Sequence, residues 1–172
     1  MNIIILEGGD GSGKTTLAKQ LVDAGAEYVK FDRNIDNMYK EYSNLLIKSL
    51  HDYVVLDRSF ITDIVYRLHD DKKPDNMNLQ QMLYIIQSKS VAIIHCETDT
   101  SFEDSIKRGE DNITDKQDAD AIKILYNVII KMFEKYTKVP VFKYNWQKQK
   151  PIEVIKFINN EFGYMKKLKE EL

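Results

Sequence analysis

The hydrophobic positions of this chain form short continuous runs, separated by longer stretches in which apolar residues recur with helical spacing. A short apolar run bounded by polar or turn residues is typical of a strand that is buried on both faces of a sheet. Strands are predicted in this way at residues 2–7, 27–31, 53–56, 91–96 and 139–142. Amphipathic spacing predicts helices over residues 15–22, 37–50, 60–68, 79–87, 101–108, 117–136 and 151–162.

The alternation of strands and helices predicts an α/β fold, with a five-stranded parallel sheet and helices on both of its faces. In such folds, ligands bind at the carboxyl ends of the strands. The chain contains no repeat, linker or low-complexity tract, so we expect residues 1–172 to form a single domain.

The segment after the first predicted strand fits the phosphate-binding pattern G-x-x-x-x-G-K-[ST]. The loop consists of Gly8, Gly9, Asp10, Gly11, Ser12, Gly13, Lys14 and Thr15, and Thr16 follows in the predicted helix. Its backbone N–H groups and the helix N-terminus favour an anion. The Lys14 ammonium adds positive charge for the outer phosphates, and the Thr15 hydroxyl can bind Mg²⁺. We therefore expect the chain to bind a nucleoside triphosphate.

A second polar group follows the strand predicted at 53–56, at the edge where such folds bind ligands. Here Arg58 can bind a phosphate with two hydrogen bonds, and Asp57 can hold Mg²⁺ directly or through water. The alternative is a surface ion pair that caps the next helix. The phosphate loop elsewhere in the chain favours the phosphate-binding role.

Composition excludes several other classes of function. A net charge of −2 gives no reason to expect nucleic acid or a membrane surface as a partner. Cys96 is the only cysteine, so no internal disulfide can form, which suits a reducing cytosol. No apolar stretch approaches the ~20 residues of a membrane helix, and the first apolar run lacks the basic segment of a signal peptide. We expect a cytoplasmic protein.

Both motifs resemble those of thymidylate kinases. Residues 7–16, EGGDGSGKTT, are similar to the family pattern E-G-x-D-G-x-G-K-[ST]-T, and the acidic residue at Asp10 is typical of that family. Asp57 and Arg58, with Thr62, Val65 and Tyr66, are similar to D-R-x-x-x-S-x-x-A-Y. The resemblance extends to about residue 162. It implies a P-loop kinase fold in which Arg58 binds the acceptor phosphate, and it places Tyr66 on the substrate side.

The resemblance also implies a lid, here at about residues 101–116, because residues 107–111 read KRGED as in the family's lid. Phosphoryl transfer needs positive charge at the moving phosphoryl group and exclusion of water. Some family members supply this positive charge with an arginine in the phosphate loop, and others with an arginine in the lid. The loop of this chain contains Ser12 and no arginine, so we expect Arg108 to supply the charge. The alternative is that Lys107 and Arg108 form a solvated helix end.

The acceptor side matches the family less well. The family carries an R-E-P triplet after the second strand, where this chain reads KFDRN at residues 30–34. Asp32 or Arg33 could take the role of that triplet. Tyr39 and Tyr42 could stack on the acceptor base, although aromatic residues at helical spacing are more often core. Asn145 and Trp146 follow the last strand, where similar kinases pack a loop on adenine. A core anchor is the alternative role for Trp146.

The motifs predict a Mg²⁺- and ATP-dependent kinase that phosphorylates a deoxynucleoside monophosphate such as dTMP, with Asp10 orienting the acceptor sugar or the metal shell. The stretch DRSFITD at 57–63 also resembles deoxynucleoside kinases, in which an acid at the position of Asp32 accepts a proton from a sugar hydroxyl. A nucleotide-binding switch without kinase activity is the alternative from another class. The expected partners are small nucleotides or nucleosides, and the resemblance also suggests a homodimer.

Overall fold

The computed structural model describes residues 1–31, 38–73, 80, 83–84, 86–87, 90–107, 109 and 115–163, excluding the side chains of residues 38, 39, 46 and 47.

The described strands form one parallel sheet of five strands in the order β2-β3-β1-β4-β5. The strands are β1 (Asn2–Glu7), β2 (Glu27–Lys30), β3 (Tyr53–Asp57), β4 (Ser90–Cys96) and β5 (Val141–Tyr144). The central strand β1 pairs with β3 and β4 and is buried from Ile3 to Glu7, as expected for an apolar run between two layers of helices. The predicted α/β fold is confirmed.

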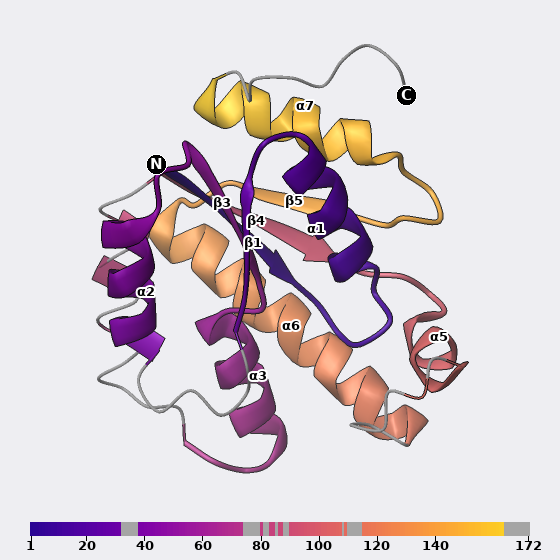
Figure 1. Ribbon diagram of the computed structural model, residues 1–172. Helices are drawn as coiled ribbons and strands as arrows, with labels where there is room; N and C mark the ends of the chain where they lie inside the picture. Colours follow the sequence, from indigo (N-terminus) through magenta and orange to yellow (C-terminus); the bar gives the residue numbers. More distant parts are fainter. Residues whose placement is uncertain are drawn as a thin grey trace.

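Helices cover both faces of this sheet (Figure 1). The helices with described bounds are α1 (Lys14–Asp23), α2 (Met38–Lys48), α3 (Phe60–His69), α5 (Ser101–Lys107), α6 (Lys116–Thr137) and α7 (Pro151–Phe162). Apolar residues of α1 and α7, such as Leu21 and Val154, pack on one face. Those of α2, α3 and α6, such as Tyr42, Ile61 and Tyr126, pack on the other. Within the described ranges, no helix is long and apolar enough to span a membrane.

The predicted boundaries of the described elements lie within two residues of the observed ones. The last strand differs most, because it begins at Val141 and not at the predicted residue 139. The cause is Pro140, which has no N–H to donate to a ladder and whose carbonyl accepts from the Ile93 N–H at 3.0 Å. The predicted helix at 79–87 lies partly outside the described residues, and the charged tail lies wholly outside them.

All pairings in the sheet are parallel, so the carboxyl ends of the strands lie along one edge. Three segments singled out from the sequence meet this edge. The phosphate loop follows β1, Arg58 follows β3, and Asn145 follows β5. The fold therefore brings these three segments to one edge of the sheet.

Candidate functional site

The phosphate loop links β1 to α1 and packs tightly against its neighbours. Gly8 has a φ of 145°, and a Cβ at this position would lie 2.0 Å from the carbonyl oxygen of Cys96. Gly13 has a φ of 88°, and a Cβ there would lie 2.7 Å from Cδ1 of Trp146. Glycine is therefore required at both positions, by backbone conformation and by space.

The Lys14 side chain folds back over this loop. Its ammonium donates hydrogen bonds to the carbonyl oxygens of Gly8 and Gly9, both at 2.7 Å, and lies 3.4 Å from the Ser12 hydroxyl. The side chain is buried. Burial is the largest influence on the pKa of Lys14 and lowers it. These contacts hold a cation at the mouth of the loop, where outer phosphates would lie.

Asp57, the last residue of β3, meets the loop from the neighbouring strand. The Thr15 hydroxyl donates to Asp57 Oδ2 at 3.1 Å, and the Tyr28 hydroxyl of β2 donates to the same oxygen at 2.8 Å. The Asp57 side chain is buried, and among the described residues its Oδ1 has no hydrogen-bond partner. A buried carboxylate oxygen without a partner is costly. A hydroxyl beside a carboxylate also suits Mg²⁺, so these residues fit the ion.

Arg58 follows Asp57 and contacts the phosphate loop directly. Its Nη2 lies 2.5 Å from Oδ1 of Asp10, and the two side chains are 18% and 9% exposed. Burial is the largest single influence on the pKa of Arg58 and lowers it, but the opposing effects of Asp10, Tyr66, Tyr126 and Asp57 together leave the pKa above its usual value. The backbone of Arg58 has a φ of 72°, a left-handed conformation that is uncommon for a residue with a side chain. The two motifs predicted separately thus form one ion-paired group.

These groups line a cavity of about 180 Å³. Its lining residues are Asp10, Gly11, Ser12, Gly13, Lys14, Thr15, Thr16, Lys30, Asp57 and Arg58. Lys30 was not among the predicted site residues. Its signal in the sequence was its position at the end of the second predicted strand. In the structure, Lys30 pairs in register with Asp57 of β3. Three cations beside two carboxylates suit a polyphosphate bound together with a metal ion.

Glu7 is a second group that the sequence did not single out as part of the site. It is fully buried at the end of β1 and accepts hydrogen bonds from the Ser59 hydroxyl and, at 2.6 Å, from the Thr62 hydroxyl. Thr62 in turn lies 3.0 Å from the Tyr126 hydroxyl. Burial raises the pKa of Glu7 to about 7, against the opposing effect of these hydrogen bonds. The network joins β1, α3 and α6 beneath the loop. A glutamate at the end of an apolar strand was its signal.

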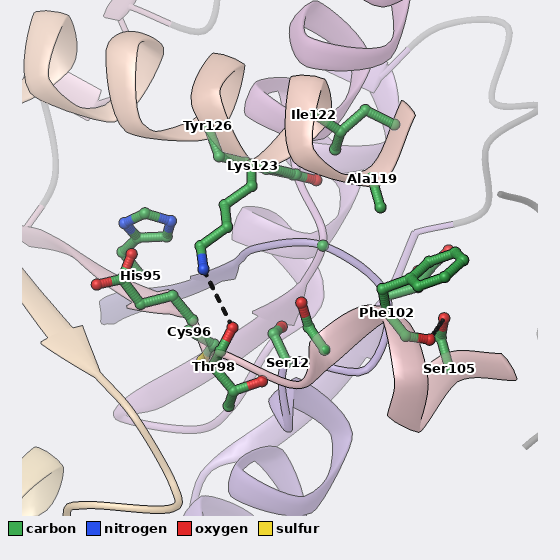
Figure 2. A pocket seen from close by; sticks show the side chains of 14 residues that line it. Ser12, His95, Cys96, Thr98, Phe102, Ser105, Ala119, Ile122, Lys123 and Tyr126 are labelled. Atoms are coloured by element: carbon green, nitrogen blue, oxygen red, sulfur yellow. Dashed lines mark hydrogen bonds between the residues drawn. The ribbon is translucent and has the colours of Figure 1, made fainter. Parts of the chain in front are cut away.

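A smaller cavity lies on the other side of the loop, between the end of β4, α5 and α6 (Figure 2). Its volume of about 30 Å³ has room for about two water molecules. Buried atoms without a partner in the described part of the chain, His95 Nδ1 and Thr98 Oγ1, belong to residues that line it. Burial lowers the pKa of His95 to about 4, so the ring is neutral at neutral pH. Lys123 donates to the Thr98 carbonyl at 3.2 Å. Water suits this cavity, and a nucleotide is too large for it.

Trp146 lies on the turn after β5, with its indole against Gly13 and 45% of the residue exposed. It is therefore not a fully buried core anchor. The neighbouring Asn145 accepts from the Gln147 N–H at 3.0 Å, which shapes the turn. Gln147 also donates to Thr100 at 2.6 Å and links this turn to the segment before α5. The indole face thus stands beside the start of α1.

Some predicted site residues are not placed. Asp32, Arg33 and Arg108 lie outside the described residues, and so does the side chain of Tyr39. The same holds for most of the predicted lid beyond α5. Tyr66 is placed on α3, partly buried against the core, and lies near enough to Arg58 to affect the pKa of the guanidinium.

No family model and no curated protein matches the sequence. Solved structures do match. The YorR protein from Bacillus subtilis, in complex with phosphorylated GDP, has a TM-score of 0.67 at 19% identity, with 91% of this chain and 93% of that chain covered. Thymidylate kinase from Candida albicans has a TM-score of 0.63 at 17% identity, with 92% and 91% covered.

Deoxyadenosine kinase from M. mycoides, with the products dCMP and dCDP bound, has a TM-score of 0.59 at 16% identity, with 92% of this chain and 96% of that chain covered. At these identities the likeness shows the fold. The strand order, the phosphate loop and the neighbours together confirm the predicted P-loop kinase fold.

Proposed function

We propose that this protein is a nucleotide kinase that transfers the γ-phosphoryl group of ATP to a nucleoside monophosphate. The observation that carries the proposal is a cavity in which the phosphate loop meets Asp57 and Arg58. A protein that only binds a nucleotide has no need for an arginine at this place. In the transfer, the γ-phosphorus forms a bond to an oxygen of the acceptor phosphate, its bond to the β–γ bridging oxygen breaks, and ADP leaves.

On the donor side, the backbone N–H groups of the loop and the Lys14 ammonium bind the outer phosphates of ATP. Thr15 and Asp57 hold Mg²⁺, which when bound neutralises charge on the phosphates. The partly exposed Trp146, which lies against Gly13 beside the start of α1, offers a surface for the adenine. Arg108 of the lid completes the charge around the moving phosphoryl group, as the family resemblance implies.

On the acceptor side, Arg58 binds the phosphate of the acceptor, and Asp10 holds the guanidinium in place at 2.5 Å. The oxygen of a monophosphate is already ionised, so its attack requires no general base. The resemblance to thymidylate kinases names a deoxynucleoside monophosphate such as dTMP as the acceptor. The fold neighbours whose names include thymidylate kinase and deoxyadenosine kinase support a nucleotide or nucleoside acceptor.

A deoxynucleoside kinase is the second candidate. It is favoured by the stretch from Asp57 to Asp63 and by the likeness of the fold to deoxyadenosine kinase from M. mycoides. This reaction needs a base to accept the proton of a sugar hydroxyl, and Asp32 is the residue proposed for it.

A panel assay tests the proposal and separates the two candidates. The protein is incubated with ATP, Mg²⁺ and each deoxynucleoside or deoxynucleoside monophosphate, and products are measured by anion-exchange chromatography. We expect a deoxynucleoside diphosphate from at least one monophosphate. A monophosphate made from a nucleoside would replace the proposal with the second candidate. ATP consumption without a phosphorylated acceptor would overturn both. The Lys14→Ala variant is the control for contaminating kinases.

A further inference from the structure

Tyr28 lies outside every motif in the sequence, yet its side chain reaches the centre of the candidate site. It belongs to the edge strand β2, whose side chains alternate between half-buried and exposed positions. Tyr28 and Lys30 are two residues apart and so share one face of the strand. Lys30 lines the phosphate cavity, and the Tyr28 hydroxyl reaches Asp57. The exposed fraction of Tyr28 is 37%, so its ring adds little to the core.

The Asp57 carboxylate is asymmetric in its contacts. Tyr28 and Thr15 both donate to Oδ2, at 2.8 and 3.1 Å, from two different elements, β2 and α1. Oδ1 has no partner among the described residues although the side chain is buried. Two donors on one oxygen restrict rotation of the carboxylate and leave the other oxygen for a different ligand.

We propose that Tyr28 is a positioning residue, which orients the Asp57 carboxylate so that Oδ1 is presented to the metal ion of the bound nucleotide. This inference rests on the proposed nucleotide binding. Tyr28 does not touch the metal or the phosphates, and it acts through Asp57 alone.

The Tyr28 hydroxyl restricts the Asp57 carboxylate more than Thr15 alone can. The Thr15 hydroxyl has one proton, which it donates in a hydrogen bond to Asp57, and its oxygen lone pairs can bind a cation. A single hydrogen bond from a threonine leaves the carboxylate free to turn, whereas the tyrosine ring adds a second, rigid donor. A tyrosine hydroxyl carries its proton at neutral pH, so it continues to donate to Asp57. Groups that orient a metal ligand in this way commonly contribute 10–100-fold to metal affinity.

The test is the Tyr28→Phe variant, with Mn²⁺ as the probe and ADP as the nucleotide. The electron paramagnetic resonance signal of free Mn²⁺ gives the bound fraction. We expect the variant to bind Mn²⁺ about tenfold more weakly in the presence of ADP. Binding of ADP without metal can be followed by the fluorescence of Trp146, because it is the only tryptophan in the sequence. We expect this metal-free binding to be unchanged in the variant. An unchanged Mn²⁺ affinity would overturn the inference, and so would an equal loss of metal-free ADP binding.

Tyr53→Phe is the matched control. The Tyr53 hydroxyl donates to the Gly163 carbonyl at 2.7 Å and not to Asp57, so its loss removes a hydrogen bond but should leave Mn²⁺ affinity unchanged. The double variant Tyr28→Phe/Asp57→Asn provides a further check. If Tyr28 acts through Asp57, the double variant binds Mn²⁺ no more weakly than Asp57→Asn alone. An additive loss would contradict the inference.

Neither measurement involves an acceptor or turnover. A protein that binds Mn²⁺ and ADP but phosphorylates no acceptor would overturn the proposed function and leave the role of Tyr28 standing. Conversely, kinase activity together with unchanged Mn²⁺ binding in Tyr28→Phe would overturn only the role of Tyr28.

Discussion

At the scale of single residues, Arg58 has the most demanding environment in the site. It combines a left-handed backbone conformation, an ion pair with Asp10 and a mostly buried guanidinium. Non-glycine residues in such conformations persist where the surrounding structure holds them, and they are common at ligand sites. Here the Arg58 N–H donates to the Leu6 carbonyl at 3.2 Å, and the Ser59 hydroxyl caps α3. The backbone around Arg58 is thus fixed from both sides.

We predict that Arg58→Ala raises the KM for the monophosphate acceptor and lowers kcat. Hydrogen bonds to charged groups contribute about 2 kcal/mol, so we expect kcat/KM for the acceptor to fall roughly 30-fold. The KM for ATP should change little, because the loop and Lys14 hold the donor. Steady-state kinetics at saturating ATP measure both constants.

Arg67→Ala is the matched control for this experiment. Arg67 pairs with Asp63 on the exposed side of α3 at 2.8 Å, and such exposed pairs contribute little to stability. Acceptor kinetics in the Arg67 variant should match those of the wild type. Unaltered acceptor kinetics in Arg58→Ala, with the fold intact by circular dichroism, would contradict the role of Arg58.

At the scale of elements, the end of β1 is joined to α3 and α6 through Glu7. Ser59, which precedes α3, and Thr62 in its first turn donate hydrogen bonds to this buried carboxylate. Tyr126 of α6 contacts Thr62. These contacts fix the start of α3, and therefore Arg58, relative to the phosphate loop. Because Glu7 is titratable, its contribution to the free energy of unfolding can be measured from the pH dependence of that free energy.

Burial raises the pKa of Glu7 from 4.5 to about 7, so the folded protein keeps a proton that the unfolded chain loses at lower pH. A raised carboxyl pKa stabilises the folded state at low pH, and that contribution is lost as the pH rises through the folded pKa. A shift of this size corresponds to about 3 kcal/mol. We predict that the free energy of unfolding of the wild type, relative to Glu7→Gln, falls by about this amount between about pH 4.5 and pH 8.

Urea titrations of the wild type and Glu7→Gln across this range check the prediction. Every other titrating group is common to the two proteins, so its contribution cancels in the difference. A difference that does not depend on pH would show that Glu7 has the same pKa in the folded and unfolded states.

At the scale of the whole molecule, the order of elements and the parallel sheet were predictable because the burial pattern is simple. Strands such as β1 lie between two helix layers and are buried along almost their whole length, whereas helices such as α6 bury one side only. The boundary that shifted most was set by Pro140, whose effect on the ladder depends on its partner in β4. The phosphate loop was predictable because its chemistry needs a local sequence.

The contacts across the site were less predictable, because they join residues far apart in the chain. Tyr28 and Asp57 are 29 positions apart, and Glu7 and Thr62 are 55 positions apart. Neither pair has a local signature: one donor is a tyrosine on an edge strand, the other a threonine on a helix face. The sequence therefore predicted Asp57 and Arg58 as phosphate and metal residues, but neither the tyrosine that orients Asp57 nor the buried glutamate beneath the loop.

The central claim is that the phosphate loop and the Asp57–Arg58 pair form one site of phosphoryl transfer. The most direct test uses ATP labelled with ¹⁸O in the nonbridging oxygens of its γ-phosphoryl group, together with Mg²⁺ and the acceptor that is active in the panel assay. Mass spectrometry then locates the label. We predict that it appears in the terminal phosphoryl group of a nucleoside diphosphate. Label found only in inorganic phosphate would contradict the claim, because it would show hydrolysis without transfer.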